Sequence, residues 1–521
     1  MPQRIGIIDL GSNTTRMVIY EYERDRYFRM EDEIREVVRL REGMGRTNVL
    51  RAAAIQRAIN AMRMFKDLGD SLGVDEITVV ATSAVRDAVN RESFLARVKA
   101  ETGWTLRLLS GEEEGRYGAL GAVNATCLRN GFVIDLGGGS AQIVEVRDGI
   151  PGRVVSLPLG ALRLTELFFP NNKIKPEQVE ALRAAISELL DEIVWFRAQP
   201  GDQLVAIGGA IRNLGKIDQE RKHYPLSAIH GYRIAAKDLA GMADKLWRYS
   251  LRRRRNVKGL RADRADIIPA AAIVYDMLLE HSGFEELTIS RPGLREGIFF
   301  EHFLSHLPQP LFPDLRRFSI LSLARIFNSD DPHSRHVAFL ALRMFDDLHP
   351  VHGLDEGYRE LLWAAGILHD IGTIINYPYH HQHSYYIILN YTLYGYRPRE
   401  LAIIALITRY HRNKGVPKAR EMSPLLTEED NRALVILCGI IRLAEYLERG
   451  RRGVIRDLRC HVDVENGWVQ IETLTAGGHA AIELWEAERN VDVLSSALEM
   501  DVEMVEGVWM GEEEPNDSLT P

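Results

Sequence analysis

The sequence has 521 residues, of which 46% are hydrophobic and 26% charged, and 65 Lys and Arg against 73 Asp and Glu give a net charge of −8. This composition excludes a disordered or collagen-like chain, and at roughly 150 residues per domain the length predicts about three to four domains. An acidic chain is also a poor general binder of nucleic acid, because that affinity rests on clustered Lys and Arg.

The N-terminus and the cysteines indicate a reducing compartment. The first apolar run is only a few residues long and enters a turn, so it does not resemble a signal peptide, and no segment reaches the ~18 apolar residues of a transmembrane helix. Cys127, Cys438 and Cys460 lie far apart, which argues against a disulfide framework or a zinc finger. We therefore expect a cytoplasmic protein that contacts neither membrane nor nucleic acid.

The chain begins with a segment that recurs later. Residues 5–20 read I-G-I-I-D-L-G-S-N-T-T-R-M-V-I-Y, and residues 132–146 read F-V-I-D-L-G-G-G-S-A-Q-I-V-E-V. Each joins two β-rich runs through Asp-Leu-Gly and a turn of small residues, which is typical of a hairpin. The repeat predicts two lobes of similar design, beginning near residues 4 and 131.

Helix-like and strand-like segments alternate around these hairpins and predict an α/β fold. Helices are expected at 51–69, 91–101 and 176–196, and buried strands at 76–82 and 203–208. Three prolines in 307–313 indicate a linker. Beyond it, apolar spacing predicts helices at 315–328, 333–348, 359–370, 383–394, 398–411 and 431–449, then β-like runs at 460–475 and a disordered tail.

The two hairpin turns form a candidate phosphate cradle. Glycines let backbone N–H groups approach phosphate oxygens, and the hydroxyls of Ser12, Thr14, Thr15 and Ser140 can donate further bonds. Asp9 and Asp135 end the two strands, and Mg²⁺ is commonly held by one or two carboxylates together with substrate phosphates. A single Asp-Leu-Gly could be an ordinary turn with an Asx bond, but two matching copies favour the cradle.

Two further segments lie between the repeats. Arg86 follows the carboxyl end of the strand at 76–82, where ligands collect in α/β sheets, although a surface ion pair is the alternative. Ser110 and Glu113 fit a capping box at a helix start, which leaves Glu114 without a structural role. Glu114 points about 100° away from Glu113 around the helix and is a candidate acceptor of a proton from an attacking water.

A basic run spans residues 248–264. It holds eight Lys or Arg against one Asp, a net charge of +7 in an acidic protein. Such a run is either a solvated helical face or a surface that attracts a polyanion.

Taken in order, these segments resemble the exopolyphosphatase / guanosine-pentaphosphatase (Ppx/GppA) family. The resemblance rests on D-L-G-S-N-T at 9–14, T-S-A-V-R-D-A at 82–88, S-G-E-E-E-G-R at 110–116, I-D-L-G-G-G-S at 134–140, A-I-G-G at 206–209, R-A-D at 264–266 and G-L-R-E-G at 293–297. It covers about residues 1–305. It implies an actin-like, sugar-kinase-like fold of two RNase H-like lobes with the active site between them, and Mg²⁺-dependent removal of a terminal phosphate from polyphosphate or guanosine pentaphosphate, with Mn²⁺ as a second candidate ion.

The resemblance also assigns roles to residues of this chain. Glu114 falls on the catalytic base, and Asp135, with Asp9 close to it, on the metal site. The candidate phosphate-binding residues are Ser12, Asn13, Thr14, Arg86, Gly137, Gly138, Gly139, Ser140, Gly208, Gly209, Arg261 and Arg264. One position departs from the family's pattern: G-G-G-S is usually followed by Thr-Glu, and here Gln142 replaces that metal-associated Glu.

The helical region resembles the HD phosphohydrolase fold. Nine of the 16 histidines lie between residues 333 and 411. The HD pattern implies a candidate transition-metal site made by His336, His369, Asp370, His383, His411 and Glu445, the last in place of the usual Asp. The alternative is a degenerate fold retained for its shape and for dimer contacts.

These readings predict an α/β chain with actin-like lobes at 1–125 and 126–306, an all-α HD-like domain at 314–455 and a small β-containing domain at 456–510. We expect a homodimer whose ligand is polyphosphate or guanosine pentaphosphate. The sequence leaves two alternatives open: an actin-like ATPase or sugar kinase, and a catalytically weak protein that binds polyphosphate or an alarmone.

Overall fold

The computed structural model describes residues 2–45, 47–171, 173–412, 420–475 and 480–509. The chain folds into two compact units: Met1–Tyr224 with Ile229–Leu315, and Pro225–Ala228 with Arg316–Pro521. None of the described helices is both long and apolar enough to cross a membrane.

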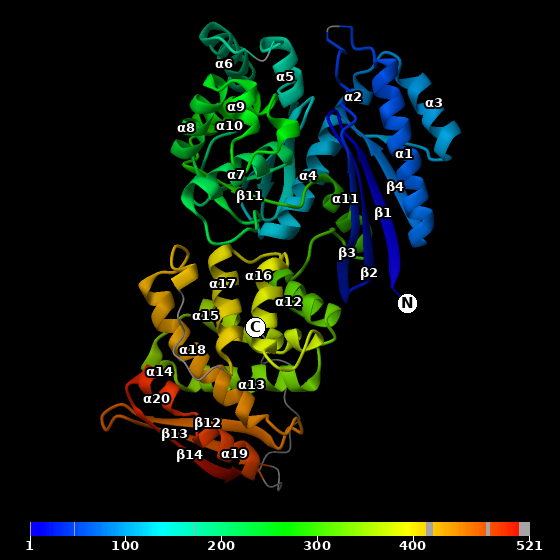
Figure 1. Ribbon diagram of the computed structural model, residues 1–521. Helices are drawn as coiled ribbons and strands as arrows, with labels where there is room; N and C mark the ends of the chain where they lie inside the picture. The colour runs from blue at the N-terminus through cyan, green and yellow to red at the C-terminus, as the bar shows by residue number, and fades with distance from the viewer. Residues whose placement is uncertain (1, 46, 172, 413–419, 476–479, 510–521) are drawn as a thin grey trace. The chain divides into compact units, whose positions relative to one another are not determined.

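The first lobe of the N-terminal unit is built on a mixed sheet with strand order β3-β2-β1-β4-β5 (Figure 1). Its strands are β1 (Gln3–Leu10), β2 (Thr15–Glu23), β3 (Tyr27–Glu36), β4 (Glu76–Ala81) and β5 (Arg107–Leu108). The hairpin β1–β2–β3 is antiparallel, whereas β4 pairs in parallel with β1 and β5. The apolar face of α1 (Ala52–Leu72) packs with α3 (Arg91–Thr102) on this lobe.

The second lobe repeats this design. Its strand order, β8-β7-β6-β9-β11-β10, matches that of the first lobe with one edge strand added. The strands are β6 (Gly131–Leu136), β7 (Ala141–Arg147), β8 (Ile150–Leu157), β9 (Gln203–Ile207), β10 (Arg233–Ala235) and β11 (Glu286–Ile289). The helices are α5 (Ala161–Phe168), α6 (Pro176–Asp191), α7 (Gly209–Lys222), α8 (Ala236–Arg248), α9 (Leu251–Arg255), η1 (Ala262–Arg264) and α10 (Ile268–Ser282). The repeat predicted from the two hairpins is confirmed.

Two helices join the lobes by unusually close packing. A Cβ atom on Gly297 of α11 (Leu294–Phe303) would lie 1.8 Å from the carbonyl oxygen of Tyr117 in α4 (Gly111–Thr126). A Cβ on Gly121 of α4 would lie 2.1 Å from the carbonyl oxygen of Gly293. Only glycine allows this approach, because any larger residue would force the helices apart. On its other side α11 packs against β2, where Tyr20 stacks on Phe299 at 4.2 Å between ring centroids.

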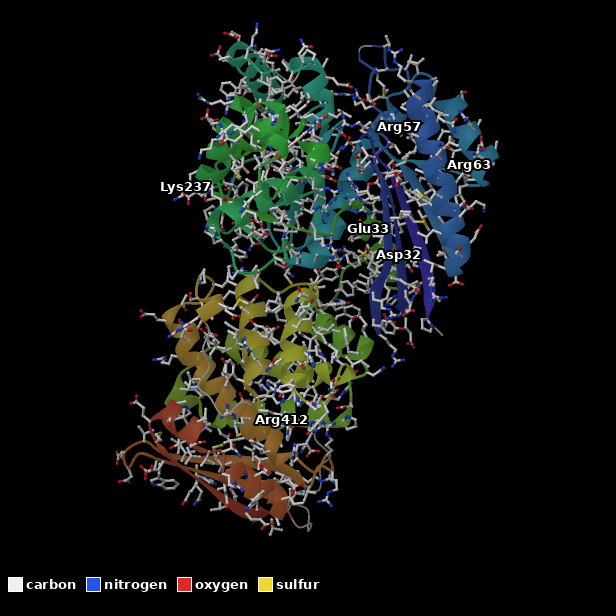
Figure 2. All side chains as sticks on the ribbon, in the orientation of Figure 1. Asp32, Glu33, Arg57, Arg63, Lys237 and Arg412 are labelled. Carbon is white, nitrogen blue, oxygen red and sulfur yellow. The ribbon has the colours of Figure 1, made fainter. Side chains whose placement is uncertain are left out.

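Charged side chains cover the outside of this unit. Figure 2 shows Asp32 and Glu33 on β3, and Arg57 and Arg63 on α1. Many of these charges form ion pairs, such as Arg57 with Glu42. Exposed pairs of this kind contribute little to stability.

The C-terminal unit is a helical bundle with a small sheet. Its helices are α12 (Leu315–Ile326), α13 (Pro332–Asp347), α14 (His349–His352), α15 (Glu356–Leu368), η2 (Ile371–Ile374), α16 (His380–Asn390), α17 (Pro398–Tyr410), η3 (Arg420–Met422) and α18 (Glu428–Leu447). The sheet has strand order β12-β13-β14, with β12 (Ile455–Asp463), β13 (Trp468–Thr475) and β14 (Asp501–Val508), and α19 (Ala481–Glu488) and α20 (Asp492–Leu498) precede β14.

The helices predicted beyond the linker are all present, with ends displaced by a few residues. The largest displacement is in α16, which begins at His380 and ends at Asn390 rather than spanning 383–394. In the N-terminal unit, the expected helix at 176–196 begins with Pro176 in its first turn but ends at Asp191. The expected disordered tail, residues 511–521, lies outside the described residues.

Candidate active site

The two hairpin turns of the repeat face each other in the N-terminal unit. A Cβ atom on Gly139 would lie 2.5 Å from Oγ of Ser83 and 2.8 Å from Oγ of Ser12, and one on Gly138 would lie 3.1 Å from Cβ of Ser12. The hydroxyls of Ser12 and Ser83 are themselves 2.9 Å apart. Glycine in the second turn is therefore needed for the two turns to meet.

A cavity of about 130 Å³ lies between these turns. Backbone and small polar side chains form its floor, among them Gly11, Ser12, Asn13, Thr14, Gly137, Gly138, Gly208 and Gly209. Both side-chain polar atoms of Asn13 are buried, and among the described residues neither has a hydrogen-bond partner. A buried amide without partners is costly, so this position is suited to a polar ligand.

Asp9 and Asp135 both line the cavity, each near the end of the first strand of its lobe. Oδ1 of Asp9 is buried without a hydrogen-bond partner among the described residues, and Oδ2 lies 3.9 Å from Nη1 of Arg295. Burial, followed by the nearby charge of Asp9, raises the pKa of Asp135 to about 6. Two half-buried carboxylates whose like charges lie close together provide a suitable environment for a divalent cation.

Glu114 also lines the cavity, from the first turn of α4. Ser110 and Glu113 form the capping box that the sequence predicts, and Glu114 points elsewhere and is only 7% exposed. Nη1 of Arg86 donates to its Oε2 at 3.1 Å. Burial raises the pKa of Glu114 to about 8, although Arg86 acts in the opposite direction. This carboxyl can therefore take up or release a proton near neutral pH.

Arginines from separate segments complete the wall of the cavity: Arg16, Arg212, Arg264, Arg291 and Arg295. Burial and neighbouring arginines lower the pKa of Arg16 and of Arg212 to about 10. Arg264 is affected in the same way, and it packs so closely on Gly209 that a Cβ there would lie 2.3 Å from its Nη2. These guanidinium groups remain charged at neutral pH and repel one another. A polyanion would relieve that repulsion.

Comparison with known proteins identifies the chain. A model of the Ppx/GppA phosphatase family matches residues 18–306, and a model of Ppx/GppA phosphatase domain III matches residues 315–487. The chain belongs to the Ppx/GppA phosphatase family. Membership of this family makes it a phosphate hydrolase and confirms the resemblance seen in the sequence.

Solved structures of Ppx/GppA proteins are similar to more than half of the chain. The Aquifex aeolicus family member is 28% identical, with a TM-score of 0.52, over 59% of this chain and 100% of its own. An exopolyphosphatase from Cytophaga hutchinsonii is 22% identical, with a TM-score of 0.55, over 60% of this chain and 100% of its own. At that identity the second likeness establishes the fold alone.

Most residues expected at the Ppx/GppA site line the cavity, and a few lie apart from it. Gly139 and Ser140 belong to the second turn but not to the lining, and Arg86 reaches the site through its bond to Glu114. Arg261 is largely exposed and pairs with Asp263. Sequence reasoning did not select Arg16, Arg212, Arg291, Arg295 or Glu296; only the last two belong to a recognised motif, G-L-R-E-G.

Gln142, which departs from the Ppx/GppA pattern, pairs directly with Asp135 across β6 and β7. Directly paired residues lie on the same face of a sheet, so the side chain of Gln142 lies on the same face as that of Asp135. Its amide nitrogen donates to the hydroxyls of Ser140 at 2.9 Å and Ser156 at 3.0 Å, and its oxygen is buried without a partner among the described residues. The position therefore offers a neutral oxygen where the family usually has a charged one.

The basic run of residues 248–264 does not form one surface. Arg254 is fully buried and donates to the carbonyl oxygen of Asp266, and Arg264 faces the cavity. Arg252, Arg253 and Arg255 are exposed on α9. Only part of the +7 charge is therefore available to attract an anion from solvent.

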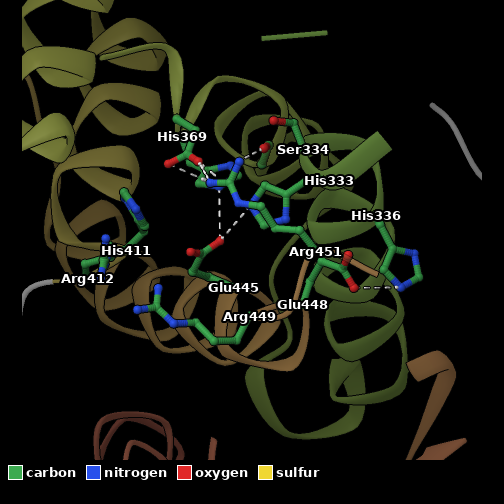
Figure 3. Close-up of polar contacts among 12 residues, drawn as sticks. His333, Ser334, His336, His369, His411, Arg412, Glu445, Glu448, Arg449 and Arg451 are labelled. Atoms are coloured by element: carbon green, nitrogen blue, oxygen red, sulfur yellow. Dashed lines mark hydrogen bonds and ion pairs between the residues drawn. The ribbon is translucent and has the colours of Figure 1, made fainter. Parts of the chain in front are cut away.

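In the C-terminal unit, histidines and carboxylates gather at one place, but two of them differ from the residues expected. His333 and His380 join His369, Asp370, His411 and Glu445. His336 instead donates to the carbonyl oxygen of Ile455 at 2.7 Å. Figure 3 shows it apart from the cluster, beside Glu448. Among the described residues, His383 belongs to neither group of possible metal ligands. His336 and His383 each lie three positions, or about one helical turn, after the histidine that joins the cluster. Sequence spacing alone does not show which of two histidines one turn apart faces inward.

Proposed function

We propose that the cavity of the N-terminal unit removes the terminal phosphate from inorganic polyphosphate, guanosine pentaphosphate or both, with Mg²⁺ as cofactor and Glu114 as general base. One observation carries the proposal: buried Glu114, paired acids and clustered arginines line the same small cavity. Phosphoryl transfer requires positioning and neutralisation of charge more than covalent chemistry, and this lining supplies both.

The phosphate chain would be held by the arginines and the glycine-rich turns. Arg16, Arg212 and Arg264 neutralise charge, while backbone N–H groups of the turns at 11–14 and 137–140 are suited to terminal phosphate oxygens. Among the described residues that line the cavity, none is aromatic, so a guanine base would find no aromatic ring to stack on there. This feature favours the inorganic chain over the nucleotide.

The residues present fit a divalent cation, since Oδ1 of Asp9 is buried without a partner and the pKa of Asp135 is raised. Asp9 and Asp135 would hold it. When bound, Mg²⁺ would neutralise charge on the phosphate oxygens.

Hydrolysis then follows from the position of Glu114. A water oxygen attacks the terminal phosphorus while the Glu114 carboxylate accepts its proton. The bond between that phosphorus and the bridging oxygen breaks, and the bridging oxygen keeps the electron pair as the new end of the shortened chain. Orthophosphate is released, and Arg86, which donates to Oε2, orients the carboxylate.

A weak or non-catalytic polyphosphate-binding protein is the second candidate, because Gln142 replaces a charged residue on the face of Asp135. One assay separates the two: release of orthophosphate from long-chain polyphosphate, guanosine pentaphosphate and ATP, each with and without Mg²⁺. We expect Mg²⁺-dependent release from polyphosphate. Binding without release would favour the second candidate, and preferential hydrolysis of ATP would favour an actin-like ATPase.

A further inference from the structure

The second lobe contains a pocket apart from the cavity of the candidate active site. It lies between α7, α8 and the segment that follows α9 (Figure 1), and its volume is about 280 Å³. Among the described residues, none lines both this pocket and the active-site cavity. The proposed hydrolysis uses none of the residues of this pocket.

The wall of the pocket is apolar. Met242 and Leu246 of α8 are buried in the core of the lobe, and Ile217 and Val257 are half-buried against it. Tyr249 adds a half-buried ring. A dry apolar cavity of roughly 150 Å³ already holds a molecule the size of benzene, so this pocket has room for a larger ring or a short acyl chain.

A glycine in α8 keeps the pocket open. Gly241 lies in the interior of that helix, where glycine is destabilising relative to alanine. Packing does not require glycine there, since a Cβ atom would meet no described atom within 4 Å. In α7, by contrast, a Cβ on Gly215 would lie 2.4 Å from Cδ1 of Ile289. The missing side chain at position 241 therefore preserves empty space rather than a close contact.

Charged side chains surround the mouth of the pocket. Lys245 and Lys258 are exposed there, and among the described residues neither forms an ion pair. Arg221 is also present but pairs with Asp218 at 2.7 Å, and the exposed Glu220 carries the opposite charge. Two lysines without carboxylate partners beside an apolar wall favour a ligand that is apolar at one end and anionic at the other.

Two segments of the chain run from this pocket to the active-site cavity. The first is α7, in which Gly209 and Arg212 line the cavity and Ile217 lines the pocket. The second begins with Lys258 at the pocket and reaches Arg264 at the cavity six residues later. Both segments therefore have one end at each site.

The two segments are also joined to each other between the sites. The backbone N–H of Arg261 donates to Oδ1 of Asn213 in α7 at 2.9 Å. A Cβ atom on Gly259 would lie 2.5 Å from the carbonyl carbon of Lys216, so only glycine allows this approach. A ligand that displaces either segment at the pocket would therefore displace the arginines at the cavity.

We propose that this pocket binds an amphipathic organic anion, an apolar body with one carboxylate or phosphate, and that the bound ligand changes the affinity of the active-site cavity for polyphosphate. The apolar body would lie against Met242, Leu246 and Val257, and the anionic group beside Lys245 and Lys258. Inorganic polyphosphate has no apolar part, so it is not the ligand of this pocket. The binding of the anion is independent of the proposed function, whereas its effect on polyphosphate rests on that function.

Titration of the full-length protein with octanoate, octyl phosphate and octanol, followed by calorimetry, tests the ligand class. We expect one saturable site that binds at least one of the two anions about tenfold or more tightly than octanol. Lys245→Gln with Lys258→Gln should remove that preference. Arg252→Gln with Arg255→Gln, which removes exposed charge from the neighbouring α9, is the matched control and should retain it. Equal affinity of the wild type for octanol and both anions would overturn the proposal.

Gly241→Phe tests the interior of the pocket. The added ring would occupy the space that the ligand needs, so saturable binding of octanoate should be lost. Gly241→Ala adds one methyl group and should bind octanoate within about threefold of the wild type, with a higher Tm because glycine is removed from a helix. Octanoate binding that survives in a folded Gly241→Phe protein would overturn the assignment to this pocket, and so would loss of binding in Gly241→Ala.

Equilibrium binding of long-chain polyphosphate, with and without saturating octanoate, tests the coupling without any hydrolysis. Octanoate should change the dissociation constant for polyphosphate by about fivefold or more, and polyphosphate should change that for octanoate by the same factor. Gly241→Phe should show no response to octanoate. An unchanged constant in the wild type would overturn the coupling. A wild type that binds octanoate but no polyphosphate would contradict the proposed function and the coupling with it, while the octanoate site would stand.

Discussion

Both units of the chain contain carboxylates shielded from solvent, and their neighbours shift the pKa values of these carboxylates in opposite directions. In the N-terminal cavity, burial and Asp9 raise the pKa of Asp135 to about 6. In the C-terminal cluster, burial would also raise the pKa of Asp370, but His369 and His380 lower it well below its ordinary value. The pKa of His369, which is buried against Asp370 and Glu445, is raised to about 9, so its protonated form is favoured at neutral pH.

The difference shows what each site can bind. The cavity combines carboxylates that repel each other with arginines that also repel each other, so it gains from a hard cation and a polyanion together. The cluster instead places imidazoles against carboxylates, with Nε2 of His369 3.2 Å from Oε2 of Glu445, so opposite charges can compensate each other there.

The largest effect is expected from Asp135→Ala. Loss of this carboxylate should lower Mg²⁺-dependent release of phosphate by more than about 10³-fold, because charge on the phosphate is no longer neutralised at the site. The exposed Asp148→Ala, in the same lobe, is the control. Activity that survives with unchanged dependence on Mg²⁺ would show that Asp135 does not hold the ion.

Gln142→Glu should strengthen the binding of Mg²⁺, whereas Asp135→Ala weakens it. A carboxylate on the face of Asp135 adds negative charge beside the proposed ion, so the Mg²⁺ concentration at half-maximal activity should fall by roughly tenfold. Gln142→Met keeps the length of the side chain without its oxygen and serves as the control. An unchanged requirement for Mg²⁺ in Gln142→Glu would place this position outside the coordination of the ion.

Replacement of the exposed Arg252, Arg253 and Arg255 by Gln should raise KM for long polyphosphate by about threefold or more and leave short chains unaffected. High salt should erase the difference, because it screens exposed charge. Arg254 is retained because it is buried. Arg57→Gln with Arg63→Gln removes exposed charge from α1 as the control (Figure 2). An equal effect on both chain lengths would exclude a role in attracting the polymer.

The smallest effect concerns stability. A carboxyl whose pKa rises from 4.5 to about 8 on folding binds more protons in the folded state, so its contribution to stability falls as the pH rises through that interval. Glu114→Gln removes this loss and should raise the Tm by about 2 °C or more at pH 9, with little change at pH 4. Calorimetry at pH 9 and pH 4 measures this change in Tm. The same change in Tm at both pH values would contradict the raised pKa of Glu114.

The fold could be predicted from the sequence where the pattern is local and repeated. The Asp-Leu-Gly hairpins predicted two lobes, and both sheets have the corresponding strand order. The capping box at Ser110 and Glu113 left Glu114 as the residue without a structural role, and the structure brings it into the cavity with Asp9 and Asp135.

What could not be predicted depends on packing between distant segments. The cavity arginines come from β2, α7, η1, the segment between β11 and α11, and the start of α11, so no local pattern joins them. The choice of His333 over His336, and of His380 over His383, depends on the rotation of α13 and α16 within the bundle. Arg254 lies within a run of charge and is nevertheless buried.

The turnover of Glu114→Gln tests the central claim most directly. With long-chain polyphosphate and saturating Mg²⁺, kcat should fall by about 10²–10⁴-fold while the affinity for polyphosphate, measured by equilibrium binding, stays within about threefold of wild type. Glu112→Gln, in the same first turn of α4, should behave as wild type. Near-normal kcat in Glu114→Gln would contradict the account, because the proton of the attacking water would then have another acceptor.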